Sequence, residues 1–131
     1  MIGTGCSGSV TSTDKIGDEY WSFEIGDELN DKYRLEVSGY SGDSGDSLQY
    51  EGDLNGNGLF DAYNHDEMKF TTSDQDNDEN DSQNCAVSRG GGWWYNRCMM
   101  TCLTCKASRH EMYTLPVVSR LINSRMVIKP Q

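Results

Sequence analysis

The sequence predicts an α+β domain with little helix, in which short antiparallel strands support long loops. Three observations lead to this fold class. Apolar and polar residues alternate in three segments, residues 39–67 are dominated by Gly, Asp, Asn and Ser, and the chain contains five cysteines. Alternation with a period of two indicates half-buried strands. Turn-forming residues disfavour long helices, and cysteines in such a chain are typical of a disulfide framework.

The 131 residues are enough for one domain with a modest core. Residues 1–18 are rich in Gly, Ser and Thr and are predicted to form a flexible leader, with the domain over 19–131. No segment reaches the roughly 18 apolar residues of a membrane span. The first residues also lack the basic and apolar regions of a signal peptide.

The first two strands are predicted in YWSFEIG (20–26) and KYRLEVSGY (32–40), joined by a turn at GDELND. Each has an apolar face and a polar face, which is the pattern of a hairpin with one buried side. The apolar positions are Trp21, Phe23, Ile25, Tyr33, Leu35 and Val37.

Later elements are shorter. MKFTT (68–72) is a candidate strand, and residues 74–92 are predicted to be loop. Trp93, Trp94 and Tyr95 are expected in the core, because large aromatic residues beside a cysteine usually pack around a disulfide. SRMVIKP near the end predicts a closing strand that Pro130 terminates.

The formal net charge of −10 argues against nucleic acid and anionic membranes as partners. The charge is also segregated. Residues 43–82 carry twelve acids and one base, whereas residues 89–131 carry seven bases and one acid. We favour attraction between the two halves within one fold. The other interpretation is a basic face for an acidic ligand.

The most acidic stretch is DQDNDENDSQNC, from Asp74 to Cys85. Oxygen-bearing side chains are spaced two apart at Asp76, Asp78, Asn80 and Ser82. An irregular loop with this spacing can wrap a calcium ion, which prefers several carboxylate and carbonyl oxygens. Binding would relieve the repulsion among the acids. The alternative is a disordered acidic loop.

A second oxygen-rich stretch is DLNGNGLFDAYN (53–64). Its residues match several positions of an EF-hand-like loop, but position twelve is not Glu and no helix pattern flanks it. We interpret the stretch as a flexible insertion, with calcium binding as the less favoured interpretation. The matching residues are Asp53, Asn55, Asn57, Gly58 and Asp61, with Asn64 at position twelve.

Cys102 and Cys105 form a C-x-x-C for which the sequence leaves a bridge, free thiols and zinc binding open. A zinc site would add Cys98 and His110, although we expect His65 and His110 to be surface residues. The letters GDSL (45–48) are interpreted as a turn and not as a hydrolase serine site. We find no catalytic motif and expect no enzyme activity.

Three stretches together resemble one known family: KYRLEVSGYSGDSGDSL, MKFTTSDQDNDENDSQNCA and GGWWYNRC. They are similar to the fibrinogen C-terminal globular domain, which occurs in fibrinogen chains, ficolins and tachylectins. The resemblance runs from Glu19 to Pro130 and implies a partial domain. The family's first subdomain is missing from it, and we expect that region to support any oligomer.

The resemblance also implies a site. In the family the acidic loop binds calcium, and a disulfide joins the cysteines that match Cys85 and Cys98. In its lectin members an acetyl-group pocket lies beside that bridge, with a cis peptide before the second cysteine. The calcium ligands are expected to be the side chains of Asp76 and Asp78 and the carbonyls of Asn80 and Ser82. The pocket positions are Tyr95, Arg97, Cys98 and Met99, where Met99 replaces a histidine.

These implications lead to a functional expectation. We expect a secreted, calcium-binding recognition module that binds acetylated glycans in innate-immune or adhesion settings. The alternatives are a fibrinogen-like domain that binds an extracellular protein without lectin activity, and a non-functional fragment of a larger protein.

Overall fold

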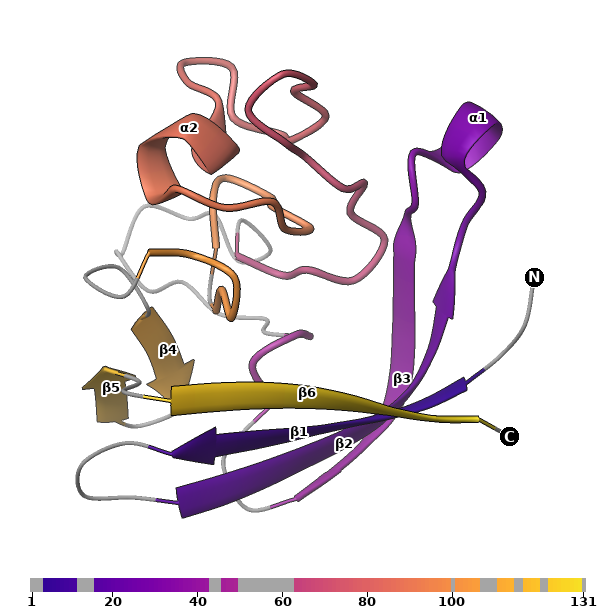
Figure 1. Cartoon of the computed structure of the whole chain (residues 1–131), viewed down its shortest axis with the longest axis vertical. Helices are drawn as coiled ribbons and strands as arrows, with labels where there is room; N and C mark the ends of the chain where they lie inside the picture. The colour runs from indigo at the N-terminus through magenta and orange to yellow at the C-terminus, as the bar shows by residue number, and fades with distance from the viewer. Residues whose placement is uncertain are drawn as a thin grey trace.

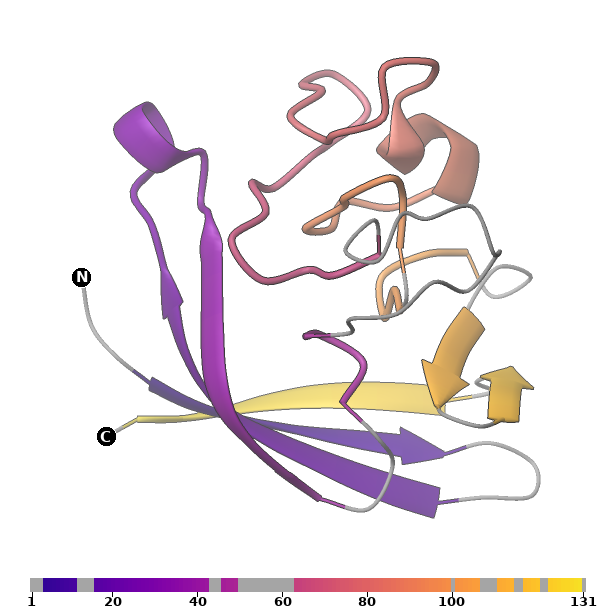
Figure 2. The ribbon, with the colours of Figure 1, turned by 180° about the vertical axis from the view of Figure 1, so that it is seen from behind.

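The computed structural model describes residues 4–11, 16–42, 46–49, 63–99, 101–106, 111–114, 117–120 and 123–130. It consists of a long curved sheet and a body of irregular loops that lies on one side of it, over residues 63–106 (Figures 1 and 2). The described residues form short antiparallel strands and little helix, which confirms the predicted α+β class. The loop body holds every residue of the acidic stretch and of the expected ligand surface.

The main sheet has four antiparallel strands in the order β3-β2-β1-β6. Its members are β1 (Thr4–Thr11), β2 (Ile16–Ile25), β3 (Leu35–Gly42) and β6 (Asn123–Pro130). A second sheet pairs β4 (Glu111–Thr114) with β5 (Val117–Arg120). The closing strand predicted from SRMVIKP is therefore confirmed as β6.

The first residues differ from the predicted flexible leader. Thr4–Thr11 form β1, and β2 already begins at Ile16. Ser7, for example, lies opposite Tyr20 of β2 and Val127 of β6. A segment of Gly, Ser and Thr carries little apolar alternation, so its own sequence gives no strand signal. Pairing with a neighbour on each side determines its conformation, since both edges of its backbone are satisfied there.

The predicted hairpin is confirmed as β2 and β3. Phe23 lies opposite Val37, and Ile25 lies opposite Leu35. Trp21, Leu35 and Val37 are buried, while Ser22, Glu24 and Glu36 are exposed, so the two faces divide as the alternation predicts. Tyr33 is the exception. It precedes β3 with a φ of 58° and is 43% exposed, because the turn directs it away from the core.

Two short helices occur where the sequence predicts a turn and a loop. The hairpin turn contains α1 (Glu28–Asp31), which Asp27 caps by accepting hydrogen bonds from the backbone N–H groups of Asn30 and Asp31. The loop after the acidic stretch contains α2 (Cys85–Arg89). A five-residue helix is too short to show helical periodicity.

The caps of α2 are nevertheless visible in the sequence. The Asn84 side chain accepts hydrogen bonds from the N–H groups of Ala86 and Val87, and Gly90 ends the helix with a φ of 85°. The candidate strand MKFTT forms only isolated bridges, from Thr71 to Trp93 and from Thr72 to Gln75.

Asp46, Ser47 and Leu48 of the GDSL letters lie in a turn, as predicted, and Gly45 lies outside the described residues. Asp46 Oδ1 accepts hydrogen bonds from the N–H groups of Leu48 and Gln49, and also from Trp21 Nε1 at 3.1 Å. The turn is thereby attached to strand β2. Ser47 is buried, 1% exposed, which does not suit an accessible nucleophile.

The core lies between the hairpin and the loop body. Its buried hydrophobic residues come from β2 and β3, from Leu48 of the turn, from the start of α2 and from described residues between Trp93 and Cys105. Trp93 packs edge-on against Trp94 with ring centroids 5.1 Å apart, and Trp94 packs in the same way against Phe70 at 5.2 Å. The prediction that the tandem aromatics pack in the core around a disulfide is confirmed for Trp93 and Tyr95. Within the part of the chain that is described, no helix is long and apolar enough to span a membrane.

Candidate functional site

The acidic loop is shaped by hydrogen bonds between residues two apart. Asp76 Oδ1 accepts from the N–H of Asp78, Asp78 Oδ1 accepts from the N–H of Asn80, and Asn80 Oδ1 accepts from the N–H of Ser82. The donor–acceptor distances are 3.2, 2.9 and 3.0 Å. Asp and Asn side chains commonly close turns on their own backbone in this way. The two-residue spacing seen in the sequence is thus the spacing of successive turns.

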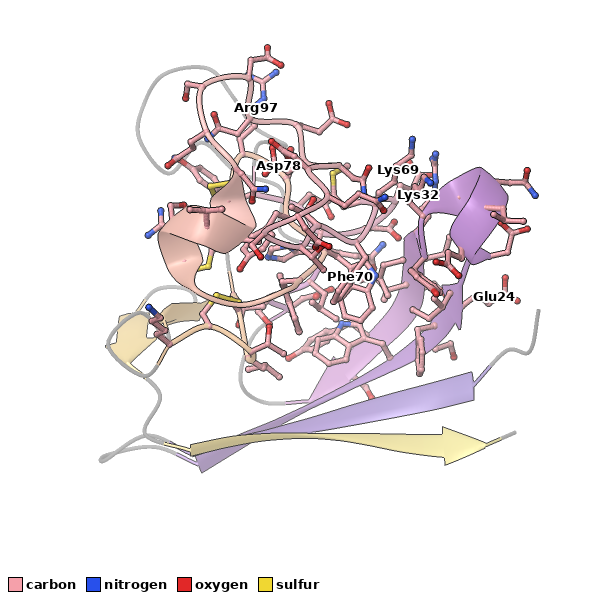
Figure 3. The ribbon with its side chains drawn as sticks, turned by 45° about the horizontal axis from the view of Figure 1, so that its top comes forward. Glu24, Lys32, Lys69, Phe70, Asp78 and Arg97 are labelled. Atoms are coloured by element: carbon pink, nitrogen blue, oxygen red, sulfur yellow. A yellow bond between two sulfur atoms is a disulfide. The ribbon has the colours of Figure 1, made fainter. Side chains whose placement is uncertain are left out.

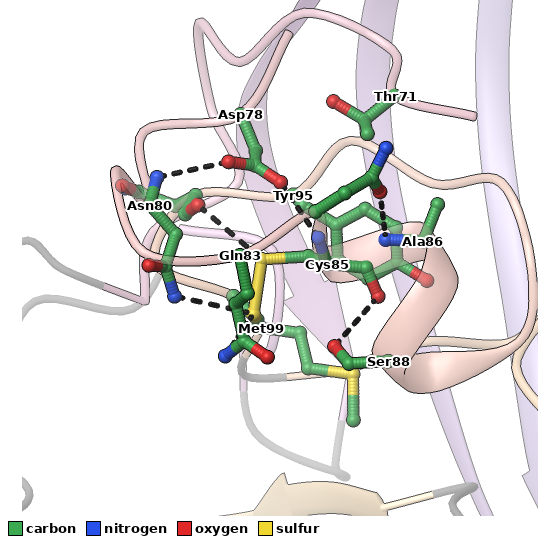
Figure 4. The surroundings of a disulfide bond; sticks show 12 residues. Thr71, Asp78, Asn80, Gln83, Cys85, Ala86, Ser88, Tyr95 and Met99 are labelled. Carbon is green, nitrogen blue, oxygen red and sulfur yellow. Dashed lines mark hydrogen bonds between the residues drawn. A yellow bond between two sulfur atoms is a disulfide. The ribbon is translucent and has the colours of Figure 1, made fainter. Parts of the chain in front are cut away.

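Asp78 also connects the loop to α2 and to a disulfide (Figure 4). Its second carboxylate oxygen, Oδ2, accepts a hydrogen bond from the N–H of Cys85 at 2.8 Å. Cys85 is the first residue of α2 and is bonded to Cys98. On the other side, the N–H of Glu79 donates to the carbonyl of Asn96 at 3.2 Å. The loop therefore has a fixed position relative to the Asn96–Cys98 segment.

Two acids are held close together in this loop. The pKa of Asp78 is raised, mainly because its carboxyl group is partly buried, and the neighbouring Asp76 carboxylate adds a further rise by repulsion. Hydrogen bonds from the N–H groups of Cys85 and Asn80 act in the opposite direction, since they favour the charged form. A cation between the two carboxyl groups would offset the cost of ionising both.

The donor set fits calcium. The expected ligands, which are the Asp76 and Asp78 carboxylates and the carbonyls of Asn80 and Ser82, offer hard oxygen atoms of the type that calcium prefers. Asp76 and Ser82 are exposed, so water can complete a coordination shell. Among the described residues, no group of three or more His, Cys, Asp or Glu side chains could hold a metal. A calcium ion here would therefore rely on backbone carbonyls and water. Residues 53–62 of the other oxygen-rich stretch lie outside the described residues.

The cysteines form two disulfides in the loop body. Cys85 pairs with Cys98, as the resemblance implies, and Cys102 pairs with Cys105. The question left open for the C-x-x-C is answered by this bridge. Cys98, Cys102 and Cys105 all lack a free thiolate for zinc, which removes the zinc interpretation for these three residues. His110 lies outside the described residues, and only the backbone of Cys6, in β1, is described.

The residues expected to line an acetyl-group pocket are mostly buried. Tyr95, Cys98 and Met99 are at most 5% exposed, whereas Arg97 is exposed. The peptide bond between Arg97 and Cys98 is cis. Figure 3 shows Arg97 and Asp78 at the same end of the loop body, away from the sheet.

The Cys102–Cys105 turn lies against Tyr95. The Tyr95 hydroxyl is 3.2 Å from Cys105 Sγ and 3.6 Å from Cys102 Sγ, and it donates a hydrogen bond to the carbonyl of Gly91. Burial raises the pKa of Tyr95 to about 12. The hydroxyl is thus engaged by the protein itself.

His65 differs from the predicted surface histidine. It is 0% exposed, and burial lowers its pKa to about 4. Its Nδ1 donates to the carbonyl of Trp94 at 2.8 Å, and its Nε2 accepts from the N–H of Thr101 at 3.1 Å. A neutral imidazole provides this combination of one donor and one acceptor. The neighbours of His65 in the sequence, Asn64 and Asp66, are polar, and no local pattern signals its burial.

Comparison with known proteins identifies a family and several relatives that this chain resembles. The family described as "Fibrinogen beta and gamma chains, C-terminal globular domain" matches residues 10–116. Human fibroleukin is 38% identical over 94 residues, covering 72% of this chain and 19% of the relative. Bovine fibrinogen-like protein 1 is 45% identical over 80 residues, covering 61% and 24%. The human fibrinogen alpha chain is 40% identical over 92 residues, covering 68% and 10%.

Solved structures share the fold. A lamprey fibrin D-dimer, complexed with the peptide ligand Gly-His-Arg-Pro-amide, aligns with a TM-score of 0.81 at 24% identity, covering 98% of this chain and 46% of that one. The fibrinogen-like globe domain of human ANGPTL6 aligns with a TM-score of 0.74 at 24% identity, covering 99% and 58%. The chain thus spans about half of these structures and a quarter or less of the curated relatives. On the family match and the fold, this chain belongs to the fibrinogen C-terminal globular domain family.

Proposed function

We propose that this chain is an extracellular recognition module that binds calcium in its acidic loop and a protein partner on the adjoining surface. The observation that carries the proposal is the position of Asp78. One of its oxygens orders the acidic loop and the other holds the N–H of Cys85. A cation bound at Asp76 and Asp78 would therefore act on the loop and on the disulfide-linked segment together.

Each part of the loop has a role in this proposal. Bound calcium would supply positive charge that offsets the repulsion between Asp76 and Asp78. The chain itself positions the oxygens, because the successive turns fix the backbone from Asp76 to Ser82. The hydrogen bond from the N–H of Glu79 to the carbonyl of Asn96 links this ordered backbone to the segment of Arg97 and Cys98.

A protein partner is favoured over an acetylated glycan by burial. Tyr95, Cys98 and Met99 are enclosed, and the Tyr95 hydroxyl is occupied by Gly91. The exposed residues at this end of the molecule include charges of both signs: Arg97, with Glu79 and Asp81 on the adjacent loop. Exposed charges of both signs suit a polypeptide with complementary charges. Binding of acetylated glycans stays a prediction from the family resemblance.

The relatives support an extracellular protein partner. Fibroleukin and fibrinogen chains share this domain, and the lamprey structure holds a peptide, Gly-His-Arg-Pro-amide. That peptide is cationic at neutral pH, whereas this chain carries a net charge of −10. Long-range attraction between opposite charges favours encounter of such a pair.

The test is a binding assay on non-reduced protein with two probes. One probe is fluorescent Gly-His-Arg-Pro-amide, with a scrambled peptide of equal charge as its control. The other is an N-acetylglucosamine-bearing glycan, with free N-acetylglucosamine as competitor. We expect sequence-dependent binding of the peptide in calcium and a large loss of it in chelator. Glycan binding that free N-acetylglucosamine abolishes, with no peptide binding, would contradict the proposal and favour the lectin alternative.

A further inference from the structure

The acidic loop contains a tripeptide that matches the acceptor sequence of a covalent modification. The chain has nine asparagines, and Asn80 alone is followed two residues later by Ser or Thr, with a residue other than Pro between them. Asn80-Asp81-Ser82 is therefore the single Asn-x-Ser/Thr acceptor sequence for N-linked glycosylation in this sequence. It lies within the candidate calcium loop.

The local structure suits an acceptor. The Ser82 hydroxyl donates a hydrogen bond to Asn80 Oδ1 at 2.7 Å, and the Ser82 N–H donates to the same oxygen at 3.0 Å. The turn thus holds the hydroxyl and the amide group of the acceptor sequence in contact. Asp81 and Ser82 are exposed and Asn80 is half-buried. An irregular surface loop is where such an acceptor is usable.

We propose that Asn80 is N-glycosylated when the chain passes through a secretory compartment. The reaction uses a lipid-pyrophosphate-linked oligosaccharide as the glycosyl donor. A bond forms between Asn80 Nδ2 and the anomeric carbon of the first sugar, while the bond from that carbon to the phosphate oxygen breaks. The lipid pyrophosphate leaves with the bonding electron pair, and Nδ2 gives up one of its two protons. No oxidant or reductant is required.

The folded structure places the glycan beside the disulfide. Asn80 Nδ2 lies 3.7 Å from Cys98 Sγ, and Figure 4 shows the amide directed at the Cys85–Cys98 bond. The first sugar would therefore stand next to Cys98 and the exposed Arg97. Modification consumes neither Asn80 Oδ1 nor the Asn80 carbonyl, so the turn and the expected calcium ligand are retained. The glycan would shield part of the proposed partner surface without removing the metal site.

Cell-free translation of the full chain behind a cleavable signal peptide, with rough microsomes, tests the acceptor directly. We expect a product of higher mass that peptide N-glycosidase returns to the mass of the bare polypeptide. Asn80→Gln and Ser82→Ala should each abolish the added mass, and Ser82→Thr should keep it. Because transfer is measured on the translocated chain whether or not it folds, a folding defect in a variant does not obscure the result.

Mass spectrometry of the protein secreted from eukaryotic cells assigns the residue. Enzymatic removal of the glycan should convert Asn80 to Asp and leave the other asparagines unchanged. A translocated chain with no added mass, or added mass that survives Asn80→Gln, would overturn the proposal. The inference rests on the extracellular route proposed above. Its failure is distinguishable from that of calcium binding, which is measured on wild-type protein produced without glycosylation.

Discussion

Asp78 shows how one side chain can serve both the fold and a site. Its two oxygens accept from the N–H groups of Asn80 and Cys85. Partial burial and the adjacent Asp76 carboxylate both raise its pKa. The N–H groups stabilise the charged form at a position where burial and repulsion oppose it. A bound cation would favour the same charged form, which is why the residue is the centre of our functional proposal.

The contribution of the carboxylate pair to calcium binding is testable by a substitution that keeps the side-chain shape and removes one negative charge. Asp76→Asn keeps an oxygen that can accept from the N–H of Asp78 but removes a ligand charge. At calcium about 100-fold above Kd, a bound ion should raise the free energy of unfolding by about 2.7 kcal/mol. We expect Asp76→Asn to lose most of this increment, measured as denaturant unfolding with and without calcium.

Asp81→Asn is the matched control. It removes one negative charge from the same loop at an exposed residue that is outside the expected ligand set. The control should keep the calcium increment. An equal loss in Asp76→Asn and Asp81→Asn would mean that the loop attracts cations by overall charge and has no defined site.

His65 is buried in the fold, although the sequence predicts a surface residue. In the unfolded chain its pKa is near 6.5, and in the fold burial lowers it to about 4. Between these values the unfolded state binds more protons, so the stabilising contribution is complete above pH 6.5 and is lost as the pH falls toward 4. The shift corresponds to about 3 kcal/mol. Protonation would also remove the acceptor for the Thr101 N–H.

We therefore expect the free energy of unfolding to fall steeply between pH 6.5 and pH 4, as measured by urea denaturation. His65→Gln is the comparison, since it has an amide in place of the imidazole and does not titrate in this range. The variant should be less stable at pH 7 and should lose less stability on acidification. Identical pH profiles for the two proteins would contradict the assigned role of His65.

At the scale of elements, the sequence predicts what alternation and turn chemistry determine locally. The β2–β3 hairpin follows from the alternation around Trp21 and Leu35, and the GDSL turn follows from its small and acidic residues. Strand β1 could not be predicted in this way. Its Gly-, Ser- and Thr-rich sequence is held by β2 and β6, and β6 is more than 110 residues away in the chain, as the pairing of Thr4 with Pro130 shows.

The sequence predicts helix α2 only in part. Asn84 and Gly90 are ordinary start and stop signals for a helix, but five residues between them are too few for periodicity to confirm one. The Cys85–Cys98 disulfide is expected from resemblance to a family, not from spacing. For the acidic loop, the two-residue spacing indicates a calcium site, and the resemblance supplies the expected role of each ligand. The enclosure of Tyr95 by the Cys102–Cys105 turn depends on packing between segments that no local pattern specifies.

The two disulfides should differ in what they contribute to stability. Cys85 and Cys98 are 13 residues apart, whereas Cys102 and Cys105 are 3 apart. In the chain-entropy description a longer closed loop gives more stabilisation, roughly 3 kcal/mol for the first bridge and about 2 kcal/mol for the second. We expect the Cys85→Ala/Cys98→Ala protein to be the less stable of the two double variants in denaturant unfolding.

A second readout separates the bridges further. Removal of Cys85 and Cys98 should also weaken calcium binding, because Asp78 is attached to the N–H of Cys85. The Cys102→Ala/Cys105→Ala protein should bind calcium normally, with a more exposed Tyr95 that quenchers of tyrosine fluorescence reach more easily. The reverse order of stabilities and affinities would contradict this account of the loop body.

At the scale of the whole molecule, the distribution of charge and the described part of the fold both support the proposed function. The acids concentrate before residue 83 and the bases after residue 88, and the acidic loop lies against the Asn96–Cys98 segment of the basic half. The chain carries about half of the fibrinogen-like structures that it resembles. The described part of that fold includes the acidic loop, the disulfides and the surface between them, so it holds the parts that the proposed function requires.

The most direct test of the central claim is a thermal melt of the non-reduced protein in calcium and in chelator, with magnesium as the control cation. Because a ligand that binds only the folded state raises the midpoint by mass action, our account predicts one cooperative transition that shifts upward in calcium and not in magnesium. A cooperative transition at the same temperature in calcium and in chelator would contradict a calcium site at Asp76 and Asp78.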